Sequence, residues 1–225
     1  MDFYEKLRQE RIVPVVKIND AAKAPELARA LLAGGLSVIE LTFRSAAAAD
    51  AIRAVCREVP ELAVCAGTVL TPEQAAEAVE AGAQAIVSPG TNEEVVRWCL
   101  HRGVPVIPGV ATPTEAEACI RMGLDTLKLF PAETVGGVGM LKALAGPYSY
   151  LRFMPTGGIN LKNLPSYLAL PNVLCCGGSW IAPEKLIDAG DFAAITELAR
   201  EAALLTRPAR WRGSWCTRSA SSQEA

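Results

Sequence analysis

One lysine stands inside an apolar run, where an ordinary solvated lysine is not expected. The run is Thr126–Phe130, and Lys128 lies between two leucines. Burial among apolar side chains disfavours the ammonium ion and leaves an amine that can attack a carbonyl group. Schiff-base lysines need this environment. We therefore predict that Lys128 is a nucleophile that forms a Schiff base.

A second lysine competes for this role. Lys17 lies in the apolar run Ile12–Ile18, and strand alternation places it on the inner face as well. It is followed by Asn19 and Asp20, so we expect it nearer to solvent, where it could pair with Glu40. Lys128 is the favoured nucleophile and Lys17 is the alternative.

Polar and apolar side chains alternate in the run Ser37–Phe43. Because successive side chains of a strand point to opposite faces, one face is wholly apolar and comprises Ile39, Leu41 and Phe43. The opposite face comprises Val38, Glu40, Thr42 and Arg44. Charged side chains on an inward-facing side of a strand are costly to bury unless a functional site uses them. We therefore predict a functional role for Glu40 and Arg44, with a structural ion pair between them as the alternative.

Two later segments place adjacent glycines beside a hydroxyl side chain. They are Thr156-Gly157-Gly158 and Gly177-Gly178-Ser179. Glycines let backbone N–H groups approach an anion closely, which is how many phosphate sites are built. The pattern predicts a phosphate site, and ordinary tight turns are the alternative.

Eight short apolar or β-branched runs provide the strands that would position these residues. They start about 19 to 25 residues apart, which is the length of one strand–helix unit with short loops. The predicted strands are Ile12–Ile18, Ser37–Phe43, Leu62–Thr68, Ala85–Ser88, Val104–Ile107, Thr126–Phe130, Leu151–Pro155 and Val173–Cys176.

Helical signals separate the strands. They include Pro25–Ala33 and Pro72–Ala81, the second with Thr71 as its N-cap and Pro72 at its first position. Glycines stand where helices should end, at Gly34-Gly35, Gly82, Gly103 and Gly123. Strands that alternate with helices imply a parallel sheet. Eight such units predict an α/β fold, a single-domain (β/α)8 TIM barrel with eight parallel strands over residues 1–206.

The barrel also accounts for where the polar residues fall. Active sites of these barrels lie at the carboxyl ends of the strands, and phosphate is usually bound after strands seven and eight. The two glycine segments directly follow the seventh and eighth predicted strands, Leu151–Pro155 and Val173–Cys176. An open doubly wound sheet is the alternative fold, but no Gly-x-Gly-x-x-Gly follows the first strand.

Composition excludes several other classes of protein. The 22 Lys and Arg against 24 Asp and Glu give a net charge of −2, so we expect no nucleic-acid or membrane partner. No apolar run is long enough to span a bilayer, and the first residues do not resemble a signal peptide, which predicts a cytoplasmic protein. The one histidine and seven cysteines fit neither a zinc site nor a Ser-His-Asp triad. We expect that the protein binds no metal and that its cysteines are free thiols.

The final stretch, residues 207–225, differs from the rest. It carries a charge of +3, against −5 for the preceding residues, and shows no helical period. We predict a basic, disordered tail, and binding of an acidic partner is the alternative.

With these residues in view, the chain resembles the 2-keto-3-deoxy-6-phosphogluconate (KDPG) aldolase family, which includes 4-hydroxy-2-oxoglutarate aldolases. The resemblance covers about residues 11 to 205 and excludes the tail. The matching segments are Val38–Arg44, Ala66–Leu70, Ser88–Gly90, Ile107–Gly109, Lys128–Glu133, Pro155–Ile159 and Gly177–Trp180.

The resemblance implies a class I aldolase that needs no metal and releases pyruvate and glyceraldehyde 3-phosphate. Lys128 would attack the C2 ketone, and Glu40 would be the general acid and base. Arg44 and Thr68 would hold the substrate carboxylate, with Phe130 as an apolar wall. Pro89 would also contact the substrate. The phosphate would be bound by Thr156, Gly157, Gly158, Gly178 and Ser179. The resemblance also implies cleavage of 4-hydroxy-2-oxoglutarate to pyruvate and glyoxylate, and a homotrimer.

Two other functions are compatible with the same residues. A phosphosugar isomerase or epimerase would use Glu40 as its base and Lys128 as an electrostatic stabiliser, without a covalent adduct. A non-catalytic phosphometabolite-binding protein would have no need to bury either residue.

Overall fold

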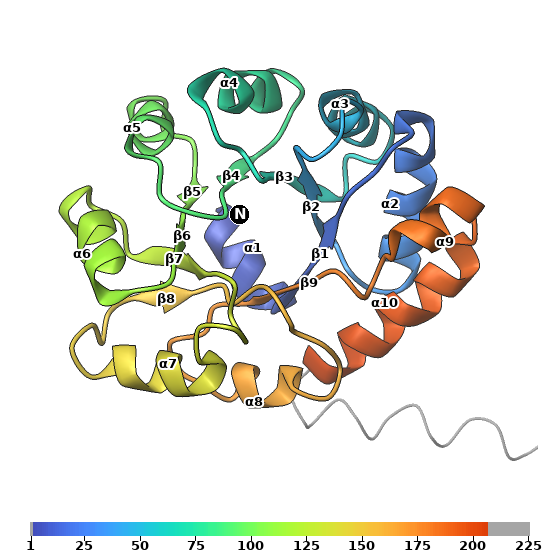
Figure 1. The fold of residues 1–225 in the computed structure, drawn as a ribbon. Coiled ribbons are helices and arrows are strands. Elements are labelled where there is room, and N and C mark those ends of the chain that lie inside the picture. The colour runs from blue at the N-terminus through green and yellow to red at the C-terminus, as the bar shows by residue number, and fades with distance from the viewer. Residues whose placement is uncertain (1, 207–225) are drawn as a thin grey trace, which may run out of the picture.

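Parallel strands alternate with helices along the chain. The structure is a computed structural model, and it describes residues 2–206. The strands are β1 (Ile12–Val16), β2 (Val38–Thr42), β3 (Ala63–Gly67), β4 (Ala85–Val87), β5 (Val106–Ile107), β6 (Gly109–Val110), β7 (Thr126–Leu129), β8 (Arg152–Phe153) and β9 (Cys176–Gly178). The strands surround a central space and the helices α2 to α10 surround the strands (Figure 1).

The helices follow the strands, except for the first. Their bounds are α1 (Phe3–Glu10), α2 (Ala24–Ala33), α3 (Ala48–Glu58), α4 (Pro72–Glu80), α5 (Glu93–His101), α6 (Pro113–Arg121), α7 (Gly137–Ala145), α8 (Leu164–Leu168), α9 (Glu184–Ala189) and α10 (Phe192–Thr206). A short 3₁₀ helix over Ala21–Lys23 precedes α2. The predicted α/β class with parallel strands is therefore confirmed.

The strands form two hydrogen-bonded sheets rather than one continuous sheet of eight. The larger sheet has the order β5-β4-β3-β2-β1-β9, and the smaller has the order β6-β7-β8. Only Pro108 separates β5 from β6, and proline has no N–H to continue a ladder. At the other junction, isolated bridges join Phe153 to Val173 and Thr156 to Gly177.

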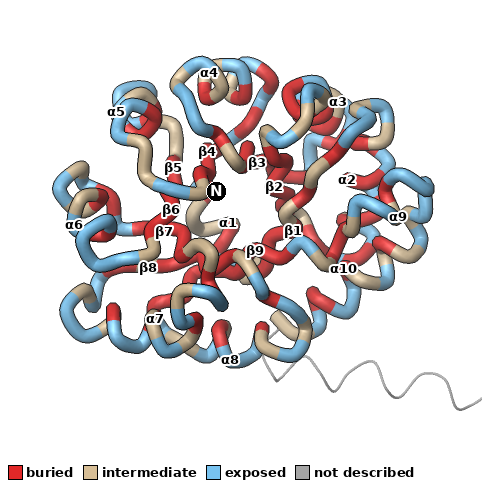
Figure 2. Tube along the Cα trace, in the orientation of Figure 1, coloured by how far each residue is buried: buried red, intermediate tan, exposed pale blue. Residues whose placement is uncertain are grey.

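Strand alternation divides the buried apolar residues into two clusters. One lies between the strands and the outer helices and includes Ile39 and Leu41 from β2. The other lies inside the ring and includes Val38 from the opposite face of β2. In Figure 2 the strands are red along most of their length, whereas the outer turns of the helices are pale blue. The predicted faces of this strand are confirmed.

Helix α1 closes the amino-terminal end of the ring. Phe3 and Leu7 belong to the inner cluster, and α1 lies behind the central space in Figure 1. The Tyr4 hydroxyl donates to the carbonyl of Val106 at 3.3 Å and accepts from its N–H at 3.2 Å. This helix does not cover the opposite end of the ring, where the carboxyl ends of the strands lie.

Local signals for helix ends are largely confirmed. Thr71 caps α4, its hydroxyl accepting from the N–H of Gln74 at 3.2 Å, and Pro72 is the first helical residue. Gly35, Gly82, Gly103 and Gly123 have positive φ angles after their helices. The last strand differs from its prediction over Val173–Cys176, because β9 begins at Cys176 and continues through both glycines.

Two further predictions, on the cysteines and on membrane-spanning segments, concern residues 2–206. The six cysteines in this range are free, and Cys56 alone among them is not fully buried. No helix in this range combines the length and apolar character needed to cross a bilayer. The predicted tail, residues 207–225, lies outside the described residues.

Candidate active site

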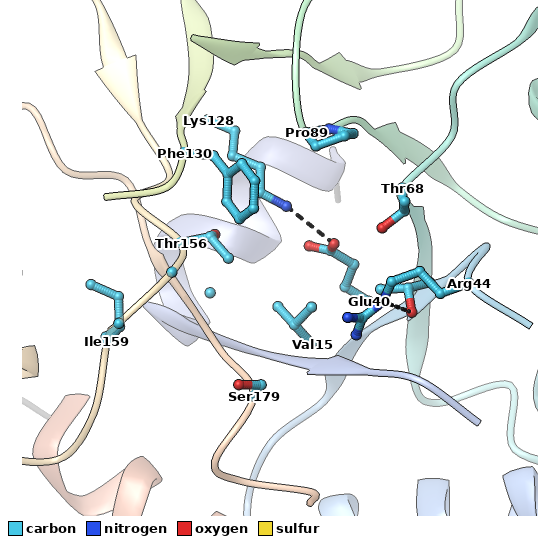
Figure 3. Close-up of a pocket in the computed structure, with 14 residues that line it drawn as sticks. Val15, Glu40, Arg44, Thr68, Pro89, Lys128, Phe130, Thr156, Ile159 and Ser179 are labelled. Atoms are coloured by element: carbon cyan, nitrogen blue, oxygen red, sulfur yellow. Dashed lines mark hydrogen bonds and ion pairs between the residues drawn. The ribbon is translucent and has the colours of Figure 1, made fainter. Parts of the chain in front are cut away.

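A cavity of about 240 Å³ opens at the carboxyl ends of the strands. It gathers side chains from nearly every part of the ring (Figure 3). Its lining comprises Val15, Glu40, Thr42, Arg44, Thr68, Pro89, Lys128, Phe130, Thr156, Gly157, Gly158, Ile159, Gly177 and Ser179. All predicted site residues except Gly178 are among them.

Lys128 and Glu40 form a buried pair in this cavity. The Nζ atom of Lys128 lies 3.3 Å from Oε1 of Glu40, and the two side chains are 5% and 0% exposed. The second carboxylate oxygen of Glu40 has no hydrogen-bond partner among the described residues. The Lys128 Nζ atom also lies 5.3 Å from the centre of the Phe130 ring (Figure 3). An amine and a carboxylate this close can exchange protons with each other and with a molecule bound beside them.

The alternative pairings do not occur in the structure. Lys17 binds Glu184 at 2.7 Å rather than Glu40, it is 32% exposed, and it does not line the cavity. Hydrogen bonds from Lys17 and Asn19 hold the pKa of Glu184 below its usual value. The described residues contain no ion pair between Glu40 and Arg44.

A glycine makes room for the Glu40 carboxylate. Any Cβ on Gly67 of β3 would lie 2.1 Å from Oε1 of Glu40. Cys65 lies in the same strand, and burial raises the pKa of its thiol well above the usual value, with the Glu40 charge adding to the effect. This thiol therefore remains protonated at neutral pH and is not a competing nucleophile.

Thr42 orients Arg44 at the cavity wall. The Thr42 hydroxyl donates to the carbonyl of Val16 at 2.9 Å and accepts from Nε of Arg44 at 3.1 Å. Because Nε is occupied, the terminal nitrogens of the guanidinium are left for an anionic group. The sequence placed Thr42 on the polar face but gave it no role.

Thr68 lies near Arg44 on the same side of the cavity (Figure 3). It follows β3 directly and has a φ angle of 56°, which is left-handed and unusual for a β-branched residue. Backbone conformations of this kind cluster at binding sites. The apolar walls are completed by the predicted Pro89 and Phe130. Val15 and Ile159 also contribute to these walls and were not predicted.

The Thr156–Gly158 turn carries several polar groups without hydrogen-bond partners in the described part of the chain. Gly157 and Gly158 have φ angles of 101° and 81°, and their N–H groups donate to no acceptor among the described residues. The Thr156 hydroxyl is buried without a hydrogen-bond partner. A Cβ on Gly177, the neighbouring residue of β9, would lie 2.3 Å from this hydroxyl.

Gly178 differs from the other predicted phosphate residues because it does not line the cavity. The space that its Cβ would occupy is filled by the ring of Trp180, at 2.0 Å. Its lack of a side chain therefore accommodates Trp180, whereas Gly177 and Ser179 of the same segment line the cavity.

The described residues hold no cluster of three or more His, Cys, Asp or Glu side chains placed for a metal ion. The cavity residues bring together an amine, a carboxylate, the guanidinium of Arg44 and the free N–H groups of the glycine turn.

Comparisons with known proteins identify relatives with this arrangement of elements. The profile described as "Aldolase: KDPG and KHG aldolase" matches residues 3–198. The 2-dehydro-3-deoxy-phosphogluconate aldolase of Treponema pallidum is 50% identical over 198 residues, covering 88% of this chain and 94% of the relative.

Two solved structures are similar over most of their length. The KDPG aldolase of Legionella pneumophila, with pyruvate captured as a covalent carbinolamine intermediate, has a TM-score of 0.86 and 41% identity, covering 88% of this chain and 97% of its own. The enzyme of Zymomonas mobilis ZM4 with 3-phosphoglycerate has a TM-score of 0.84 and 41% identity, covering 91% and 96%. This chain therefore belongs to the KDPG and KHG aldolase family.

Proposed function

We propose that this protein is a class I aldolase that cleaves 2-keto-3-deoxy-6-phosphogluconate to pyruvate and glyceraldehyde 3-phosphate. We propose that it also cleaves 4-hydroxy-2-oxoglutarate to pyruvate and glyoxylate. The observation that carries the proposal is the buried Lys128–Glu40 pair, 3.3 Å apart within a cavity that also contains Arg44. The carbinolamine of pyruvate captured in the Legionella relative supports covalent catalysis here.

In the first half of the reaction, Lys128 gives a proton to Glu40, and the resulting amine attacks C2 of the ketone. Glu40 delivers a proton to the departing oxygen, so that the carbinolamine loses water and becomes an iminium ion. Glu40 then removes the proton of the C4 hydroxyl. The electrons of the C3–C4 bond move into the iminium, which leaves an enamine on Lys128 and releases the aldehyde.

In the second half, protonated Glu40 returns its proton to C3 of the enamine. Water then hydrolyses the resulting iminium. One proton of the water goes to Glu40, the amine of Lys128 is restored, and pyruvate leaves. No redox change and no metal are needed, because the iminium accepts the electrons of the broken bond. Glu40 has no competing hydrogen bond on its second oxygen, which supports its role in these transfers.

The remaining cavity residues would position the two ends of the substrate. The free edge of the Arg44 guanidinium and Thr68 would bind the C1 carboxylate, while Pro89 and Phe130 would cover the apolar side. The phosphate would bind to Thr156, Ser179 and the N–H groups of Gly157 and Gly158, whereas Gly178 makes room for Trp180 outside the cavity. The Zymomonas relative with 3-phosphoglycerate supports a phosphorylated ligand.

We also propose a closed arrangement for the scaffold. If β5 and β6 are one strand interrupted at Pro108, and the bridges at Val173 and Gly177 join β8 to β9, the two sheets become one barrel of eight strands over residues 1–206.

We also propose a homotrimer, which the resemblance implies, and a cytoplasmic location, which the sequence predicts. Light scattering coupled to gel filtration tests the trimer.

Pyruvate release tests the proposed function. Each substrate is incubated with the wild-type protein, and lactate dehydrogenase with NADH reports pyruvate continuously. We expect turnover of both substrates, none with Lys128→Ala, and near wild-type rates with Lys17→Ala. Sugar-phosphate isomerisation without pyruvate would indicate the isomerase instead, and binding without turnover would indicate a phosphometabolite-binding protein.

A further inference from the structure

Glu133 supports the glycine turn from outside the cavity. Its N–H donates to the carbonyl of Gly157 at 3.1 Å. A Cβ on Gly158 would lie 2.5 Å from Cγ and 2.7 Å from Cβ of Glu133, so the methylene groups of this side chain lie directly against the turn. Glu133 follows Lys128 by only five residues. It therefore connects the segment of the nucleophile to the turn that we assign to phosphate.

The carboxylate of Glu133 extends away from the turn to helix α8. Its Oε1 atom accepts a hydrogen bond from the hydroxyl of Tyr167, a residue of α8 that is fully buried. Burial, and then the bond to Glu133, raise the pKa of Tyr167 above its usual value, so it remains a donor at neutral pH. A Cβ on Gly137 would lie 2.6 Å from this hydroxyl and 2.9 Å from Glu133 Oε1, so a glycine there leaves space for the pair.

Two asparagines hold the other side of the turn. The side-chain amides of Asn160 and Asn163 donate to the carbonyl of Gly158 at 3.1 and 3.0 Å. They fix the direction of this peptide group, whereas Glu133 limits how far the turn can retreat from the cavity.

We propose that Glu133 and Tyr167 are positioning residues that hold the Gly157–Gly158 turn against the cavity and thereby favour phosphorylated over unphosphorylated substrates. The inference rests on the proposed function for its substrates. Neither residue touches the reacting atoms. Their effect is expected on phosphate binding, because a turn that retreats presents its N–H groups at a longer distance from the anion.

The test combines phosphate affinity with substrate discrimination. Tyr167→Phe removes the donor and keeps the ring, Glu133→Ala removes the support, and Glu133→Gln keeps the acceptor and the methylene groups. Tyr148→Phe is the matched control, because the Tyr148 hydroxyl donates to Glu117 at 2.9 Å and neither residue lines the cavity. Calorimetry measures the Kd of inorganic phosphate, and kcat/KM is measured for KDPG and for 4-hydroxy-2-oxoglutarate.

We expect Tyr167→Phe and Glu133→Ala to weaken phosphate binding by about 3- to 10-fold, the range of one lost hydrogen bond. Their losses in kcat/KM should be larger for KDPG than for 4-hydroxy-2-oxoglutarate. Glu133→Gln should retain most of the wild-type affinity, and Tyr148→Phe should match the wild type.

Unchanged phosphate affinity in both variants, equal losses on the two substrates, or no phosphate binding by the wild type would overturn the proposal. If Tyr167→Phe does not fold, the variants of the exposed Glu133 still decide the question. If the wild type cleaves neither substrate, the proposed function fails, and the phosphate affinities continue to test the positioning role independently.

Discussion

Replacing Glu40 by Gln separates its role as a base from its role as an ion-pair partner of Lys128. The side chain is fully buried, and the amide oxygen of Gln can still accept a hydrogen bond from the amine 3.3 Å away. Shape and reach are retained, and the ability to take up and return a proton is lost. The substitution therefore removes one chemical function from an otherwise similar cavity.

The expected loss follows from the number of proton transfers assigned to this carboxylate. A positioned general acid or base contributes about 10²–10⁴ in rate. We expect kcat to fall by about this factor, equivalent to an increase of about 2.7–5.4 kcal/mol in the activation barrier. Since the carboxylate acts mainly in the transition states, kcat/KM should fall by a similar factor and KM should change little.

Steady-state kinetics with both substrates measure the effect, and borohydride trapping of pyruvate reports whether slow imine formation persists. Glu184→Gln provides the matched control. It removes the carboxylate partner of the other lysine of interest, Lys17, outside the cavity, and it should change kcat far less. A kcat for Glu40→Gln close to that of the wild type would show that Glu40 is only a structural ion-pair partner.

Three further predictions test the binding groups and the chemistry. Arg44→Lys keeps the charge but loses the planar fork, so KM should rise for both substrates, and an unchanged KM would place the carboxylate elsewhere. Gly158→Leu introduces a side chain at a φ of 81° and against Glu133. Its loss in kcat/KM should be larger for KDPG than for 4-hydroxy-2-oxoglutarate, whereas equal losses would indicate a packing role. Incubation with EDTA should leave kcat/KM unchanged, and activity lost on chelation and restored by a divalent metal would contradict the Schiff-base mechanism.

The face of each strand could be predicted from the sequence because its period of two is set by the backbone alone. That rule placed Glu40 and Arg44 on the inner face and indicated that Lys128 was not an ordinary surface residue. The pairing of Lys128 with Glu40 could not be predicted, since the two residues are 88 positions apart and meet only when the ring forms. For the same reason the sequence left open whether Glu40 binds Lys17, Arg44 or neither.

Glycines were the least predictable part of the site. Gly157, Gly158 and Gly178 have the same side chain, yet two line the cavity and the third accommodates Trp180. A glycine gives no sign of the direction in which space is needed, because its neighbours in the fold decide this. Helix α1 was missed for a different reason, since Phe3 and Leu7 are too few to show a clear period.

Trapping of pyruvate on Lys128 is the decisive test of the Schiff-base mechanism. The protein is mixed with pyruvate, reduced with borohydride, digested and analysed by mass spectrometry. We expect a reduced pyruvyl adduct on Lys128 in the wild type and in Lys17→Ala, and none in Lys128→Ala. An adduct on Lys17, or trapping that persists in Lys128→Ala, would show that Lys128 is not the nucleophile.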